Sequence, residues 1–217
     1  MDPGRYLLYA AVILVASGAA VGVAWMLSPM STWVRRVVAL AAAGAVALFA
    51  VLEVESSLGI SALVVVASGA IAAVFAHIVV DLRVLTWLGL SAAAADVISF
   101  LFGPTRFLLE SGPRAGGYAR YLAVGFETLD GVALVVGFGD LVFMGVFTLA
   151  LWRLGAVRVA GFAAPATGLL VALAVGLAVG GTVGIPLAAT PTILYARFRL
   201  RKTRPEGIEA EGDGGQE

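Results

Sequence analysis

The sequence predicts an all-α polytopic membrane protein, a bundle of about seven transmembrane helices with a range of seven to nine. Apolar residues make up 61% of the chain and charged residues 13%, and the mean hydropathy is +1.01. Soluble domains average about half apolar and a quarter charged residues. The apolar residues also fall into runs of about 20, the length that crosses a hydrocarbon core of roughly 30 Å. The chain therefore has too much apolar surface for a soluble domain.

The apolar runs lie between charged residues or Gly/Pro turns. In chain order they cover about residues 6–27, 33–52, 58–80, 83–103, 131–152, 159–181 and 184–200. The first run is too long for the apolar region of a cleaved signal peptide and leads directly into the second, so we expect it to be retained as a span. Pro186 and Pro191 interrupt the last run.

One long connection and a polar tail divide the chain. The connection over residues 104–130 carries Arg, Glu and Asp together with Gly and Pro, and we interpret it as the one substantial loop. Residues 1–82 then hold the N-terminal helices, and residues 83–200 a second helical segment that includes the loop. Residues 201–217 are polar and rich in glycine, and we expect them to be disordered.

The placement of basic residues favours an N-out, C-in orientation. With seven spans, one side of the membrane receives the basic residues of the N-terminus and the 104–130 loop. The other side receives Arg35, Arg36, Arg83, Arg153, Arg158 and the five basic residues of the tail. Cytoplasmic loops carry an excess of Lys and Arg. The chain is therefore predicted to be a multi-pass protein whose C-terminus lies inside the cell.

Composition excludes several kinds of site. The formal net charge is zero and no basic patch with interleaved aromatics is present, so we expect no nucleic-acid partner. The absence of cysteine excludes thiol chemistry. His77 is the only histidine, so a HExxH zinc site cannot exist, and we expect no metal and no cofactor. Ser17 and Ser68, each in an Ala-Ser-Gly string, are interpreted as small packing residues and not as nucleophiles.

Two aspartates lie inside apolar runs. Asp96 is in LGLSAAAADVISFLFG and Asp140 is in VALVVGFGDLVFMGVFTLAL. A carboxylate within the bilayer costs at least a few kcal/mol, so it usually faces a cavity or a partner and is a candidate functional group. The alternative is that each aspartate pairs with an arginine or caps a helix end. Asp96 and Asp140 are therefore the candidate working residues.

The two aspartates are predicted to share one depth in the membrane. Each lies about two helical turns from the loop that joins its span to the other. Ionising both of two carboxylates that lie a few ångströms apart costs much free energy, because their charges repel, so such a pair shares one proton. The ionised carboxylate can take a proton from water while the protonated one polarises a carbonyl. This is the chemistry of an aspartic protease.

Glycines flank Phe138, which lies two positions before the second aspartate. In the string Gly137, Phe138, Gly139, Asp140, the two glycines would let another backbone come close to the carboxylate, as an extended peptide substrate requires. Ordinary helix packing is the alternative for so short a motif. We interpret Gly137, Phe138 and Gly139 as candidate substrate-binding residues.

Three strings resemble the presenilin and signal peptide peptidase family of GxGD intramembrane aspartyl proteases. Residues 96–110 (DVISFLFGPTRFLLE) resemble the presenilin segment that begins at the first catalytic aspartate. Residues 137–143 (GFGDLVF) resemble the GxGD motif that holds the second. Residues 184–191 (GIPLAATP) resemble the Pro-Ala-Leu region. The resemblance covers about residues 84–200, and the chain would be a short homologue of the prokaryotic type, located in the cell membrane.

The resemblance implies a presenilin-like catalytic core and a role for each motif. Asp96 and Asp140 would be the catalytic pair, and Pro186, Leu187 and Ala188 would line the site and position the substrate. The implied substrates are transmembrane helices or signal peptides, hydrolysed within the bilayer. The order Pro-Leu-Ala replaces Pro-Ala-Leu, and Ala95 stands where a tyrosine is usual before the first aspartate. The family has nine spans, two more than we count.

Two other functions remain open. Prepilin and preflagellin peptidases are also polytopic GxGD proteases, and their first carboxylate would be Asp81 in Val-Val-Asp-Leu-Arg, paired with Asp140. The lysine that typically follows their motif is absent. Asp81 lies close to Arg83, and the simpler interpretation is a solvated charge paired with this arginine. From a different class, an ion or proton-coupled transporter or channel could place Asp96 and Asp140 along an ion path. The oligomeric state stays undetermined.

Overall fold

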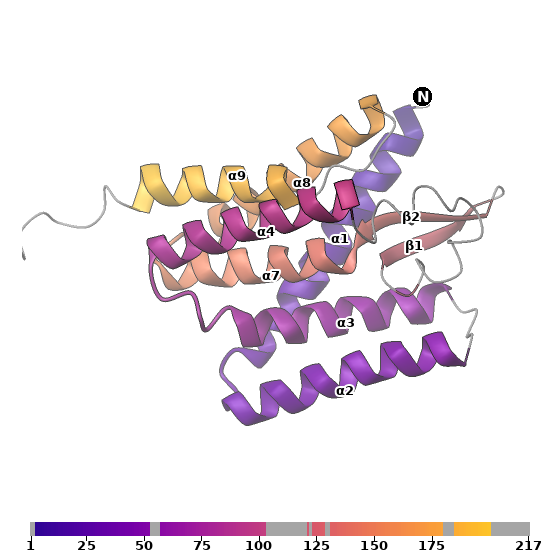
Figure 1. The fold of residues 1–217 in the computed structure, drawn as a ribbon, viewed down its shortest axis with the longest axis horizontal. Coiled ribbons are helices and arrows are strands. Elements are labelled where there is room, and N and C mark those ends of the chain that lie inside the picture. The colour runs from indigo at the N-terminus through magenta and orange to yellow at the C-terminus, as the bar shows by residue number, and fades with distance from the viewer. Residues whose placement is uncertain are drawn as a thin grey trace, which may run out of the picture.

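The computed structural model describes residues 3–52, 57–102, 121, 123–128, 131–179 and 185–200, and within these ranges the chain is predominantly helical (Figure 1). Four of the helices are long and apolar enough to cross a membrane. They are α1 (Pro3–Leu27), α2 (Thr32–Val51), α3 (Ser57–Phe75) and α8 (Arg158–Val179). The helices α1, α2 and α8 match the predicted runs closely, and these four spans indicate a membrane protein.

Three further helices, two strands and a π-helical turn complete the described part of the chain. They are α4 (Leu82–Phe102), β1 (Ala123–Thr128), β2 (Gly131–Gly137), α7 (Phe138–Arg153), α9 (Ile185–Tyr195) and a π-helical turn η3 (Ala196–Leu200). With 16 residues, α7 is about 24 Å long at 1.5 Å per residue. It is therefore shorter than the hydrocarbon core of a typical bilayer.

A β-hairpin replaces the first third of one predicted span. Residues 131–152 were expected to form a single helix, but residues 131–137 form strand β2, which pairs antiparallel with β1. The register joins Ala123 to Gly137 and Thr128 to Gly131, with an irregularity after Val124. β-Branched valines favour strands. The described fold is thus predominantly helical with one two-stranded sheet, and not purely α-helical.

Small residues bring α1, α3 and α7 close together. A Cβ atom built on Gly69 of α3 would lie 2.5 Å from the Ala20 carbonyl oxygen of α1. A Cβ atom on Gly145 of α7 would lie 2.5 Å from Cβ of Ala72 in α3. Larger side chains cannot fit at these crossings. Gly69 and Gly145 therefore let these helices approach closely, which is the use of small residues in membrane helix packing.

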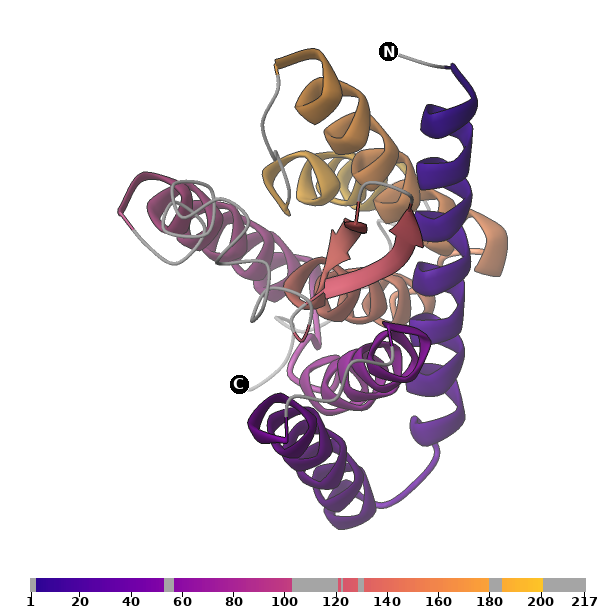
Figure 2. The same ribbon diagram turned by 90° about the vertical axis from the view of Figure 1, so that its right-hand side faces the viewer.

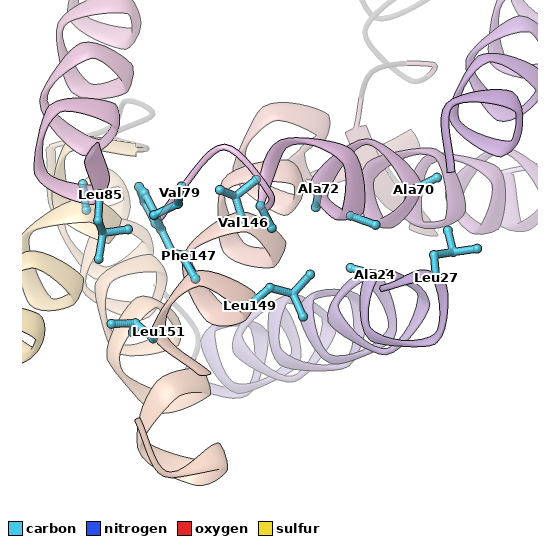
Figure 3. Packing of buried hydrophobic residues seen from close by; sticks show 14 of the residues in the cluster. Ala24, Leu27, Ala70, Ala72, Val79, Leu85, Val146, Phe147, Leu149 and Leu151 are labelled. Atoms are coloured by element: carbon cyan, nitrogen blue, oxygen red, sulfur yellow. The ribbon is translucent and has the colours of Figure 1, made fainter. Parts of the chain in front are cut away.

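The main apolar cluster lies where α7 crosses these two helices and meets the start of α4. Figure 3 shows Phe147 and Leu151 of α7 near Leu85 of α4, with Ala24 and Ala72 contributed by α1 and α3. All five side chains are buried. α7 is therefore the central helix of the described fold, and residues 1–82 and 83–200 share one core.

The helices alternate in direction, which gives the molecule two ends. The hairpin, the start of α7 and the start of α1 lie toward one end, on the right in Figure 1. The starts of α2, α4 and α8 and the ends of α3, α7 and α9 lie toward the other. We call the latter the basic end, because it carries Arg35, Arg36, His77, Arg83, Arg153 and Arg158.

Candidate active site

Asp140 lies in the first turn of α7, directly after the hairpin. The helix begins at Phe138, so the aspartate is its third residue and not two turns inside a longer helix, as the sequence suggested. Its Oδ2 atom accepts a hydrogen bond from the Gly137 backbone N–H at 3.3 Å. A carboxylate at this position satisfies a backbone donor of the first turn, and the helix dipole stabilises its negative charge.

The glycine before the motif makes room for the carboxylate itself. A Cβ atom on Gly137 would lie 3.2 Å from Oδ2 of Asp140. The backbone of Gly137 has φ −74° and ψ 155°, a conformation that any residue adopts. The limited space at Gly137 therefore comes from the close approach of the Asp140 side chain and not from backbone conformation. This contact is internal to the chain, whereas the sequence suggested an approach by substrate.

The surroundings of Asp140 are apolar on the side that faces the bundle. Leu141 and Met144 follow it in α7, are fully buried, and belong to one apolar cluster with Val136 and Val124 of the hairpin. The Asp140 residue itself is half-buried. Asp140 is therefore a partly exposed carboxylate at the border of this apolar cluster.

A hydroxyl on α3 fixes the position of the motif. The Ser68 Oγ atom donates a hydrogen bond to the Phe138 carbonyl oxygen at 3.4 Å. Ser68 is fully buried, and this contact links the start of α7 to the middle of α3. The sequence showed Ser68 only as a packing residue. Nothing in its Ala-Ser-Gly string indicates a partner 70 positions away.

Asp96 lies in the last two turns of α4, but its side chain is outside the described part of the structure. α4 packs against α9: a Cβ atom on Gly89 would lie 2.9 Å from Cδ1 of Ile193. In Figure 2 the C-terminal half of α4 points outward from α7. The pairing of Asp96 with Asp140 stays a prediction.

The third motif forms the start of α9. Pro186, Leu187 and Ala188 lie in its first turn, and their side chains are outside the described part. Proline is well tolerated there, because the first turn of a helix has no partner for its N–H groups. The sequence suggested that Pro186 and Pro191 interrupt the last run, but the backbone is helical from Ile185 to Tyr195. Since α9 packs on α4, the segments that carry the first and third motifs are neighbours.

Asp81, the alternative first carboxylate, lies toward the basic end. Its Oδ1 atom accepts a hydrogen bond from the Val84 N–H at 2.7 Å and so caps α4. The nearby residue His77 contacts Arg153, the last residue of α7, whereas Asp140 is near the first. Arg153 follows Asp140 by 13 positions in α7, a rise of about 20 Å at 1.5 Å per residue. Asp81 is thus an exposed helix cap at the far end of α7.

No family model matches the chain, and neither the curated proteins nor the solved structures contain a significant match. The candidate site therefore rests on the chain's own residues. Within the described ranges, no group of three or more His, Asp and Glu side chains is placed to hold a metal ion.

Proposed function

We propose that this protein is an intramembrane aspartyl protease that hydrolyses peptide bonds of transmembrane helices with Asp96 and Asp140. The observation that carries the proposal is the position of Asp140, a half-buried carboxylate at a strand-to-helix junction, backed by apolar residues and inside the GFGD motif. Partly buried carboxylates at the border of an apolar core are groups that enzymes use for acid and base chemistry.

The proposed reaction divides the roles between the two carboxylates. Asp140 accepts a hydrogen bond from Gly137 N–H and sits at a helix N-terminus, so it is suited to be the ionised member. It would take a proton from water as the water oxygen attacks the scissile carbonyl carbon. Protonated Asp96 would give its proton to the carbonyl oxygen, which forms a gem-diol intermediate. Asp140 would then pass the proton taken from water to the amide nitrogen. The C–N bond breaks, one hydroxyl of the intermediate returns its proton to Asp96, and the two peptide products, an acid and an amine, are released.

The hairpin supports a substrate that binds in extended form. Within the described sheet, each strand pairs on one side only, and β2 runs directly into the motif that holds Asp140. An extended segment pairing with a free sheet edge gains main-chain hydrogen bonds that an unwound helix has lost. Gly137, Phe138 and Gly139 would be the nearest part of the enzyme to such a segment, with Pro186, Leu187 and Ala188 on the neighbouring helix.

The proposed reaction requires α4 and the start of α7 to lie close together. The Asp96 carboxylate must come within hydrogen-bonding reach of the substrate carbonyl, so α4 has to lie closer to the start of α7 in the catalytic state than in Figure 2. The alternative pair of Asp81 and Asp140 would need a much larger change, since about 20 Å of α7 lies between the two positions.

Cleavage of single-span reporters in both membrane orientations tests the proposal. The chain would be assayed as wild type, Asp96→Ala, Asp140→Ala and Asp81→Ala. We expect either active-site change to lower cleavage by about 100- to 10,000-fold. Asp81→Ala, the matched removal of a helix-cap carboxylate, should keep the wild-type rate. Full activity of Asp140→Ala would exclude the proposed mechanism.

A further inference from the structure

Two basic side chains are in contact at the basic end of the bundle, and a third, that of Arg35, lies at the same end. The Nη1 atom of Arg153 donates a hydrogen bond to the Ala76 carbonyl oxygen at 2.7 Å. Its Nη2 atom lies 3.3 Å from Nε2 of His77, just beyond the end of α3. Arg153 is exposed, so this group is open to the surroundings of the protein. It joins the end of α7 to the connection between α3 and α4.

The third basic side chain, that of Arg35, is buried and has too few hydrogen-bond acceptors among the described residues. Arg35, in the first turn of α2, is only 5% exposed. Its Nη2 atom donates to Oγ1 of Thr32 at 3.2 Å. Its Nε and Nη1 atoms are buried and have no hydrogen-bond partner in the described part of the chain. Buried N–H groups of a guanidinium normally have acceptors, and a buried charge normally has a counter-charge.

The three groups share one electrostatic environment. Burial, then the charge of Arg153, then that of Arg35 lower the pKa of His77 from its ordinary value. Neither arginine forms an ion pair with any described residue, and Asp81, the described carboxylate nearest in sequence, is engaged in capping α4. The cluster is therefore cationic and not neutralised within the described part.

The position of the cluster indicates the kind of anion that reaches it. Arg35 is near the start of one candidate span, and His77 follows the end of another, which ends at Phe75. Span ends lie at the level of lipid head groups. The first turn of α2 and the end of α7 thus hold their basic groups where the phosphates of a bilayer lie.

We propose that Arg35, His77 and Arg153 form a binding site for a phosphate group, occupied by the head group of an anionic phospholipid. A guanidinium presents N–H donors in a planar fork that matches phosphate oxygens. The Nε and Nη1 atoms of Arg35 are two such adjacent donors, both without a partner among the described residues. The positive charges of Arg35 and Arg153 have no counter-charge among the described residues.

His77 is a direct probe of this site, because it is the only histidine in the chain. A phosphate held beside the imidazole stabilises its protonated form and so raises its pKa, by about one unit for a close anion. We would titrate the His77 imidazole by NMR on the full chain. The chain would be placed in nanodiscs of phosphatidylcholine alone and of phosphatidylcholine with phosphatidylglycerol.

Matched variants distinguish phosphate binding at a specific site from the effect of the surface potential of a charged membrane. Arg35→Gln removes the buried guanidinium, and Arg36→Gln removes the same charge from the exposed neighbouring residue. We expect the rise in pKa on adding phosphatidylglycerol to persist in Arg36→Gln and to shrink strongly in Arg35→Gln. Arg153→Gln is a second test in case Arg35→Gln does not fold. The amount of phosphatidylglycerol that gives half of the rise in the His77 pKa should increase about 10- to 100-fold when either arginine of the site is lost.

A further experiment distinguishes a lipid head group from a soluble phosphate ion as the bound anion. Inorganic phosphate would be added to phosphatidylcholine nanodiscs and compared with chloride at equal ionic strength. A rise in the His77 pKa with the lipid alone supports the head-group site, whereas an equal rise with inorganic phosphate supports the same chemistry with a soluble anion. Equal rises in the wild type, Arg35→Gln and Arg36→Gln mean that surface potential alone acts, and would overturn the proposal. No rise in the wild type would overturn it as well.

Discussion

The Gly137 backbone N–H donates a hydrogen bond to the Asp140 carboxylate across the junction of strand β2 and helix α7, at a distance of 3.3 Å. The same two residues define the space around the carboxylate, since a Cβ atom on Gly137 would approach Oδ2 to 3.2 Å. Two residues of the GFGD motif are thus coupled by a direct contact.

This contact predicts the effect of Gly137→Ala. The added methyl group must displace the Asp140 carboxylate by a few tenths of an ångström, while the backbone at residue 137 tolerates alanine. We expect cleavage of a reporter substrate to fall by about 10- to 100-fold, because small misplacements of a catalytic group are costly. The melting temperature should change little. Wild-type cleavage with normal stability would show that the position of this carboxylate does not limit the reaction.

The crossing of α3 and α7 predicts a packing defect. In Gly145→Ala, the new methyl group would begin 2.5 Å from Cβ of Ala72, so the two helices must separate. We expect a loss of about 1–3 kcal/mol of stability, seen as a lower melting temperature in detergent. Gly44→Ala is the matched control, since a Cβ atom there has no neighbour within 4 Å. A control that loses as much stability as Gly145→Ala would contradict the packing explanation.

His77 predicts a pH dependence of stability. Burial and the charges of Arg153 and Arg35 lower its pKa from 6.5 in the folded protein. Between the lowered value and 6.5 the unfolded chain binds more protons, so folding stability is complete above about pH 6.5 and falls as the pH drops toward the folded pKa. Thermal unfolding of the wild type and His77→Gln between pH 7.5 and 5 measures this. The variant should lose that component of the pH dependence.

The chain has no cysteine, which allows a direct distance test of the proposed pair. Asp96→Cys with Asp140→Cys should join through a short bifunctional cross-linker in the membrane, because the proposed reaction needs both side chains at one substrate carbonyl. Asp81→Cys with Asp140→Cys should remain unlinked, as about 20 Å of α7 separates those positions. Efficient linking of the second pair alone would favour the Asp81 alternative.

The long helices could be predicted from sequence because run length and flanking charge determine a membrane span. The ends of α1 and α8 lie within a few residues of the predicted limits. The hairpin was missed, because seven apolar residues at 131–137 fit a strand or a helix equally well by periodicity. The Asp130-Gly131 dipeptide before a valine-rich run was an available turn signal.

The contacts around the candidate sites could not be predicted. Asp140 was found from the cost of a carboxylate in an apolar run, which needs no knowledge of its neighbours. The bond from Ser68 to Phe138 and the contact of His77 with Arg153 join positions about 70 to 76 residues apart. Such pairs follow from how the helices cross. The way in which helices cross cannot be determined from a single sequence.

The central place of α7 has a consequence for how the protein enters the membrane. At 16 residues it is shorter than the segments that insert independently, and α1 and α3 surround it. During biogenesis it would gain its stability from the helices synthesised before it. The first 80 residues, which carry none of the protease-like motifs, would then act as an intramolecular template without which the GFGD segment has no stable place in the bilayer.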